Sequence, residues 1–307
     1  MNAPRIIYIA AIAVCALPFI DTPIALLLGI FLAQTVHHPF PTFSKKLTRI
    51  LLQASVVGLG FGMNAIEAFE VGKQGLLFTV FSIVTTITLG LFLGRKLMVE
   101  RNTSYLISTG TAICGGSAIA AIASVIKPNE KQISTALGTI FILNSLALFL
   151  FPWIGHLLHL TQHQFGVWAA IAIHDTSSVV GAAQKYGAEA LQIATTIKLE
   201  RALWIIPISI ITAFAFKRES KKVQIPYFIF LFVLAMIINT FIPSIHEVSS
   251  VIVMLSKVGL KITLFLIGSG LTKDLVVSVG VKPFVQGVVL WCFISVISLV
   301  VIFNTLL

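Results

Sequence analysis

The chain has 307 residues, of which 57% are hydrophobic and only 10% are charged, and its mean hydropathy is +1.01. A soluble domain carries about 25% charged residues, so this composition excludes an ordinary globular enzyme, and the apolar character excludes disorder. The net charge of +10 would favour nucleic acid as the partner of a soluble protein, but Lys and Arg also orient membrane helices. We therefore expect a polytopic membrane protein whose partner is the lipid bilayer and not nucleic acid.

Apolar runs between polar breaks predict an all-α protein that forms a single integral membrane domain over residues 1–307. About 20 apolar residues cross a bilayer, and the chain holds eleven candidate runs. The first run is kept as a helix because no small-residue cleavage site stands out before Asp21. In chain order, the predicted spans are about 5–20, 22–37, 46–64, 74–98, 104–126, 131–153, 164–184, 188–216, 225–243, 249–271 and 284–306.

The loops between these spans carry Lys and Arg unevenly, with 13 on one side and four on the other. Because cytoplasmic loops are enriched in Lys and Arg, this bias places the N-terminus in the cytoplasm and the C-terminus outside. We expect the membrane to be a bacterial inner membrane. The side with few basic residues holds Lys73, Lys127, Lys131 and Lys185.

An internal repeat is visible in the apolar pattern. Residues 47–72 align without a gap onto residues 255–280, matching three glycines and several apolar positions. The two segments belong to the third and tenth spans, which run in opposite directions, and inverted repeats are typical of secondary transporters. The pattern predicts inverted halves at about 22–153 and 164–307. Chance similarity between two apolar helices that contain glycine is the alternative.

Residues 107–124 interrupt the fifth span with glycine and small polar side chains and carry no charge. A helix break inside a membrane is tolerated where its backbone groups line a cavity. A half-helix that starts near Gly116 and Ser117 would direct its N–H groups at a bound anion, with Cys114 and Gly115 beside it. The alternative is a face of small residues for close helix packing.

Residues 170–184 interrupt the seventh span with a polar cluster. Asp, Thr and Ser are natural N-caps, so they could start a second half-helix, and their oxygens could bind a substrate or a cation. A His there titrates near neutral pH and could share that role. A wet loop between two short helices is the alternative. The cluster comprises His174, Asp175, Thr176, Ser177 and Ser178.

The eighth span carries Lys198, Glu200 and Arg201 in an apolar context, where charge is costly and tends to face a cavity or a partner. Lys198 and Arg201 are three residues apart and share one face of a helix. They form either a cationic patch for an anionic substrate or an internal ion pair with Glu200. For Lys257 and Lys261 in the tenth span, function and snorkelling to the membrane surface are both open.

The stretch from Cys114 to Pro152, together with Ala172 to Gly187, resembles the YeiH-type sulfate exporter family, and the resemblance covers essentially the whole chain. The first stretch is also similar to the Gly-Gly crossing helix of bile-acid:sodium symporters, and residues 60–63 are similar to their second helix. This resemblance implies a panel domain, a core domain and two discontinuous helices that cross at the substrate site. It also implies transport of a small anion, with sulfate or sulfite as the cargo.

The chain departs from that pattern in one respect. A repeat of five plus five helices after an extra first helix would break the fifth and the tenth spans, whereas the second polar break lies in the seventh. Either the seventh span is a re-entrant or miscounted element, or the tenth is broken near Lys257–Gly259. The cost of burying polar groups favours residues 174–178 at the site.

These features predict a secondary transporter of a small anion that works by alternating access and needs no cofactor or metal, with a second copy of the chain as a possible partner in a homodimer. Na⁺ or H⁺ could serve as the coupling ion, with Asp175, Glu200 and Asn144 as its candidate ligands. No Walker-type motif offers an ATP-driven motor. An anion channel is the nearest alternative, and an intramembrane enzyme, which would need a catalytic triad, is a more distant one.

Overall fold

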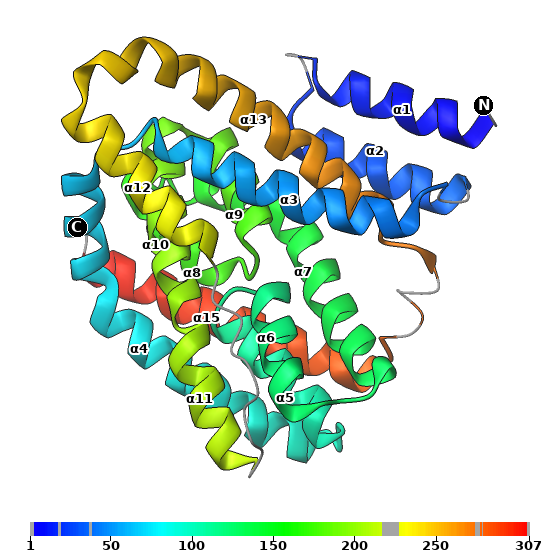
Figure 1. Cartoon of the computed structure of the whole chain (residues 1–307). Helices are drawn as coiled ribbons and strands as arrows, with labels where there is room; N and C mark the ends of the chain where they lie inside the picture. Colours follow the sequence, from blue (N-terminus) through cyan, green and yellow to red (C-terminus); the bar gives the residue numbers. More distant parts are fainter. Residues whose placement is uncertain are drawn as a thin grey trace. The chain divides into compact units, whose positions relative to one another are not determined.

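The computed structural model describes residues 3–17, 20–36, 39–216, 227–273, 277 and 279–305. Every regular element in these ranges is a helix, which confirms the all-α class (Figure 1). Four helical segments are long and apolar enough to cross a membrane, which fits the polytopic membrane protein expected from composition. They are 77–96, Glu130–Leu157, His246–Ser269 and 281–304.

The chain forms two compact units. The first unit comprises Met1–Glu70 and Pro226–Lys273, and the second comprises Val71–Ile225 and Asp274–Leu307. The helices of the first unit are α1 (Ala3–Cys15), α2 (Thr22–Thr35), α3 (Pro41–Gly60), α12 (Tyr227–Phe241), the 3₁₀ turn η1 (Pro243–Ile245) and α13 (His246–Ser269), and α4 (Ala65–Lys96) begins in it.

Small residues bring the helices of the first unit into close contact. Gly29 of α2 lies against the backbone of Phe265 in α13, so closely that a Cβ atom there would clash with it. Ser55 of α3 lies in the same way against Gly259 of α13. Close backbone approach is how helices associate where no water drives them together. Gly259 therefore serves packing, and α13 is continuous through it, so the proposed break of the tenth span near residues 257–259 is wrong.

Lys261 has a structural role in the first unit. Its side chain is buried, and its ammonium donates to the carbonyl oxygen of Leu17, just after α1, at 2.8 Å. An ammonium beside the last carbonyls of a helix interacts favourably with the negative end of the helix dipole. Lys261 thus holds α13 against the end of α1.

The second unit contains two helical hairpins and the long helices that flank them (Figure 1). Hairpin 1 consists of α5 and α6, and hairpin 2 consists of α8 and α9. The helices of the unit are α4 from residue 71 onward, α5 (Arg101–Ala112), α6 (Gly116–Ile126), α7 (Glu130–Leu157), α8 (Gln162–Ala172), α9 (Thr176–Tyr186), α10 (Ala188–Leu203), α11 (Ile205–Ala215) and α15 (Val281–Thr305).

In hairpin 1 the chain returns to the side from which it entered. The Gln132 side chain, at the start of α7, donates to the Glu100 carboxylate, which immediately precedes α5, at 2.6 Å. Asn102 in the first turn of α5 donates to Gln132 as well, at 3.2 Å. The start of α5 and the start of α7 therefore lie together, and α6 must run back alongside α5.

Hairpin 2 closes in the same way. The Tyr186 hydroxyl, at the end of α9, donates to the Leu160 carbonyl, just before α8, at 2.7 Å. The Tyr186 ring stacks on Phe165 in the first turn of α8, with the ring centroids 3.7 Å apart. The end of α9 therefore lies beside the beginning of α8.

The expectation that residues 104–126 and 164–184 each form one continuous helical span is therefore wrong. Each arm has only 11 or 12 residues, which is roughly 17 Å of helix against a hydrocarbon core of about 30 Å. The loop with Lys127 and Lys131, which was predicted on the opposite side from Arg101, lies instead at the base of hairpin 1, beside the start of α5.

The tips of the two hairpins meet beside α7. Ile140 and Phe141 in the middle of α7 lie against Gly115 and Gly116 at the tip of hairpin 1. One turn further on, the Asn144 side chain accepts a hydrogen bond from the backbone N–H of His174, at the tip of hairpin 2, at 3.0 Å. The hairpins thus approach each other from opposite ends of α7.

The predicted span 188–216 consists of two helices, α10 and α11, that are separated at Trp204. Pro207 explains the break, because it has no N–H to donate to the carbonyl of Leu203. The Trp204 N–H instead donates to the Arg201 carbonyl at 3.1 Å, as in a tight turn.

The two hairpins are also built with the same arm and break lengths, which the sequence analysis missed. The first arms end at Ala112 and Ala172, and the second arms begin at Gly116 and Thr176, so both boundaries are shifted by 60 residues. A long helix follows each hairpin, α7 in one case and α10 in the other. The second unit therefore repeats one supersecondary arrangement twice.

The hairpin geometry predicts which positions share a membrane face. In a variant whose native cysteines are replaced by alanine, we introduce Lys96→Cys, Lys131→Cys or Leu158→Cys, all at exposed positions. An impermeant thiol reagent should label the first two from the same face and the third from the opposite face. Labelling of positions 96 and 158 from one face and of 131 from the other would support two full crossings instead.

Candidate functional site

Four helix ends converge at the hairpin tips. The break of hairpin 1 spans Ile113–Gly115, and that of hairpin 2 spans Ile173–Asp175. They are in contact, because a Cβ atom on Gly115 would lie 3.1 Å from the Cβ of Asp175. The carboxyl ends of α5 and α8 and the amino ends of α6 and α9 thus share one region, where each end has backbone groups without partners inside its helix.

Arg201 covers the carboxyl end of α5. Its side chain is fully buried, and one guanidinium nitrogen donates to the Ala112 carbonyl at 2.5 Å, while another donates to the Ser82 hydroxyl of α4 at 2.8 Å. The carboxyl end of a helix carries a partial negative charge, which a cation stabilises. Arg201 thereby satisfies a carbonyl that the break leaves open.

Lys198 covers the carboxyl end of α8. It is also fully buried, and its ammonium donates to the Ile173 carbonyl at 2.7 Å and to the Ala170 carbonyl at 3.2 Å. Lys198 and Arg201 lie three residues apart on α10, so one helix supplies the cation for both hairpins. Their shared face was predicted correctly, but they bond to backbone carbonyls and not to a carboxylate.

Asp175 caps the amino end of α9. Its carboxylate accepts hydrogen bonds from the Ser178 N–H and from the Ser178 hydroxyl, each at 2.8 Å, and from the Ser177 hydroxyl at 2.5 Å. An Asp at this position satisfies the first N–H groups and the positive end of the helix. The predicted start of a half-helix within residues 170–184 is confirmed, with Thr176 as its first residue.

The amino end of α6 is the one end without a charged cap. Its N-cap is Gly115, which has no side chain, and the backbone of that residue lies at φ +65° and ψ −125°, a conformation that glycine tolerates. Gly116 is half-buried and Ser117 is exposed, so the first turn of α6 is partly accessible, while the N–H of the buried Ala118 faces the Cys114 sulfur. The predicted half-helix start at Gly116 is confirmed, while Cys114 is buried beneath it.

Several buried polar atoms near the tips have no hydrogen-bond partner among the described residues. Both ring nitrogens of His174 and the side-chain nitrogen of Asn144 are among them, as is the Thr111 hydroxyl, which the sequence gave no reason to single out. Both carboxylate oxygens of Glu200 also lack a hydrogen-bond partner, so Glu200 interacts with Arg201 through its charge without a direct hydrogen bond.

The predicted site residues therefore come together only in the second unit. Lys257 and Lys261 belong to the first unit and take no part. The sequence analysis missed the carbonyl acceptors and Ser82, since neither a backbone oxygen nor a lone serine carries a sequence signal. The described residues contain no cluster of His, Cys, Asp and Glu that could hold a metal ion. The tips bring together Cys114, Gly115, Gly116, Ser117, Asn144, His174, Asp175, Thr176, Ser177, Ser178, Lys198 and Arg201.

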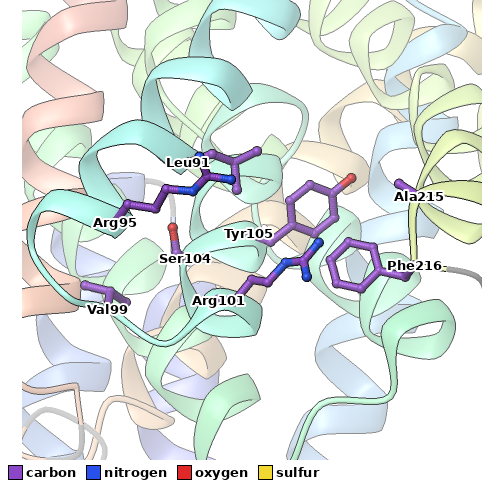
Figure 2. Close-up of a pocket in the computed structure, with 9 residues that line it drawn as sticks. Leu91, Arg95, Val99, Arg101, Ser104, Tyr105, Ala215 and Phe216 are labelled. Atoms are coloured by element: carbon purple, nitrogen blue, oxygen red, sulfur yellow. The ribbon is translucent and has the colours of Figure 1, made fainter.

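A basic cavity of about 280 Å³ lies at the base of hairpin 1, away from the tips (Figure 2). The Arg101 guanidinium lies over the Phe216 ring at 4.9 Å from its centroid, and Arg95 lines the same cavity. The Tyr105 hydroxyl is hydrogen-bonded to Thr212 at 2.6 Å. The cavity joins the ends of α4 and α11 to the start of α5 and presents two cations at its walls.

The tip of hairpin 1 should be intolerant of a side chain at position 115. Gly115→Ala forces a Cβ atom against Asp175 in a left-handed backbone conformation, and we expect it to cost about 1–3 kcal/mol. Gly116→Ala is the matched control, because its Cβ meets the Phe141 ring at 3.4 Å and the end of the Leu137 side chain at 3.6 Å, which are ordinary van der Waals contacts. The melting temperature of the purified variants checks this, and equal melting for both would contradict the described tip.

Comparison with known proteins places this architecture in a family. The family model described as conserved hypothetical protein 698 matches residues 6–287. A UPF0324 membrane protein of Bacteroides thetaiotaomicron is 55% identical over 287 residues, covering 93% of this chain and 87% of the relative. Another from Bdellovibrio bacteriovorus is 48% identical over 304 residues, covering 96% and 94%. No solved structure matches the chain. The chain belongs to the UPF0324 membrane protein family.

Proposed function

We propose that this protein is a secondary transporter of a small anion in a bacterial inner membrane, and that the anion binds at the amino end of α6. One observation carries the proposal. Of the four helix ends at the hairpin tips, three are covered by Arg201, Lys198 and Asp175, and the fourth, at the half-buried Gly116, has no charged side chain on it. Open N–H groups and the positive end of a helix dipole attract an anion.

The cations that contact the tips favour an anion as the ligand. Lys198 and Arg201 lie within hydrogen-bond reach of the tips, and the acidic groups near them are Asp175 and Glu200, which interacts with the Arg201 guanidinium. Both cations also act on Cys114, next to the start of α6. An anion bound there would be attracted by them, and the exposed Ser117 hydroxyl could donate to it.

The hairpins also suggest a membrane topology. Nine crossings, formed by α1, α2, α3, α4, α7, α10 with α11, α12, α13 and α15, would leave hairpins 1 and 2 as re-entrant elements from opposite faces. This arrangement keeps the N-terminus in the cytoplasm and moves Lys127 and Lys131 to the basic side. The bias of loop Lys and Arg then becomes 15 to two, which favours the orientation more strongly than eleven spans do.

Sulfate or sulfite is the proposed cargo, on the resemblance to sulfate exporters and on the chemistry of the site. Oxyanions of this kind accept several hydrogen bonds at once, as the first turn of a helix can supply. Re-entrant hairpins whose tips meet in mid-membrane are suited to alternating access, because backbone groups there line a substrate site. A channel would share the anion site but would not saturate with substrate.

Blocking the start of α6 tests the proposal. Gly116→Leu places a branched side chain over the N–H groups, and we expect anion uptake into proteoliposomes to fall at least about tenfold. Ala120→Leu is the matched control, since it adds the same bulk to an exposed position one turn further along α6 and should leave uptake intact. Normal, saturable uptake by the Gly116→Leu variant would contradict this site, and uptake that never saturates would favour a channel.

The substitution Asp175→Asn distinguishes the role of Asp175 as the cap of α9 from the role of its negative charge. Asparagine retains an oxygen that can accept from the Ser178 N–H, so the melting temperature should change little. Removal of the negative charge should raise the affinity for sulfate about tenfold or less, because one repulsive interaction is lost. Sulfate titration of the purified variant measures this. A weaker affinity with normal melting would assign Asp175 to a coupling ion instead.

A further inference from the structure

Two positions that cations commonly occupy in transporters with broken helices are already filled by side chains in this protein. In such transporters, unwound carbonyls and the carboxyl ends of half-helices coordinate Na⁺, while the amino ends face an anionic group. Here the carboxyl end of α5 is bonded to Arg201, and that of α8 is bonded to Lys198. Both side chains have no exposed surface.

The oxygens at the two carboxyl ends and on Asp175 already accept hydrogen bonds. The Ala112 carbonyl accepts from Arg201, and the Ile173 and Ala170 carbonyls accept from Lys198. The Asp175 carboxylate accepts three hydrogen bonds from Ser177 and Ser178. A hard cation needs several oxygen ligands at once, and at these two helix ends it would have to displace the Lys198 ammonium or the Arg201 guanidinium to obtain them.

We propose that Lys198 and Arg201 are built-in replacements for coupling cations, and that the anion therefore binds without Na⁺. This inference rests on the proposed anion site at α6 for its functional meaning. A symporter obtains this positive charge from a cation that binds together with the substrate. In this protein the side chains of Lys198 and Arg201 on α10 carry it permanently. The negative ends of α5 and α8 are neutralised whether or not the site is loaded.

Two measurements test the inference. The first is the melting temperature of the purified protein in sodium gluconate and in N-methylglucamine gluconate, without added substrate. The second is the affinity for sulfate in the same two media. The wild type should show no stabilisation by Na⁺ and a sulfate affinity that is equal in both media within about twofold. Stabilisation by Na⁺, or sulfate binding that is more than about tenfold weaker without Na⁺, would overturn the proposal.

The variant Lys198→Ala exposes the carbonyls of Ala170 and Ile173 and leaves room for an ion. We expect it to melt at a lower temperature in N-methylglucamine and to regain part of the loss in Na⁺. Lys198→Met fills the space with an apolar chain and should gain nothing from Na⁺. Lys261→Ala is the matched control, because it removes a buried lysine that also donates to a carbonyl but lies in the first unit, so its sulfate affinity should stay normal.

The melting temperature and the sulfate affinity allow a failure of this inference to be distinguished from a failure of the proposed function. If no anion binds in either medium, the anion site at α6 is wrong, and the melting temperatures still decide whether Lys198 stands where a cation would. If Lys198→Ala does not fold, the two wild-type measurements decide alone. Equal melting of Lys198→Ala in both media, with sulfate affinity unchanged from the wild type, would show that the ammonium replaces no cation.

Discussion

The structure of the second unit depends on one constraint, which is that a helix broken in a buried, apolar interior must find partners for its open backbone groups. Water can provide them at the surface of a protein, but in an interior without water each unsatisfied group costs several kcal/mol. Hairpins 1 and 2 bring four broken ends to one place. Lys198, Arg201 and Asp175 are buried there because the backbone groups need them, and their cost as charges is offset by bonds to those groups.

This constraint also explains why binding chemistry would collect at the tips. A residue that caps a helix end in low dielectric interacts strongly with it, so capping and recognition use the same groups. The end that lacks a cap is then the natural place for a ligand. Asn144 of α7 contributes by holding the His174 N–H, which fixes hairpin 2 against the long helix that both hairpins share.

The sequence was informative where composition and polarity carry the signal. Glycine and small polar residues marked the break at residues 113–115, and the Asp-Thr-Ser-Ser run marked the start of α9, because caps and breaks have local residue preferences. The direction of the chain after each break was not predictable, since a half-helix that returns and one that continues have the same apolar pattern. The contact between Glu100 and Gln132 is a long-range pairing that only the fold reveals. Pro207 was a visible signal for the division of α10 from α11 that the apolar pattern obscured.

The spacing of Lys198 and Arg201 on α10 has a mechanical consequence. Lys198 is hydrogen-bonded to hairpin 2, and Arg201, less than one helical turn away, is hydrogen-bonded to hairpin 1. A single helix therefore connects the two tips. Neither hairpin can swing away from α10 without breaking a buried bond between a cation and a carbonyl, whereas a displacement of all three elements in concert breaks none. These two hydrogen bonds therefore favour motion of both hairpins and α10 as one rigid body over the opening of either hairpin alone.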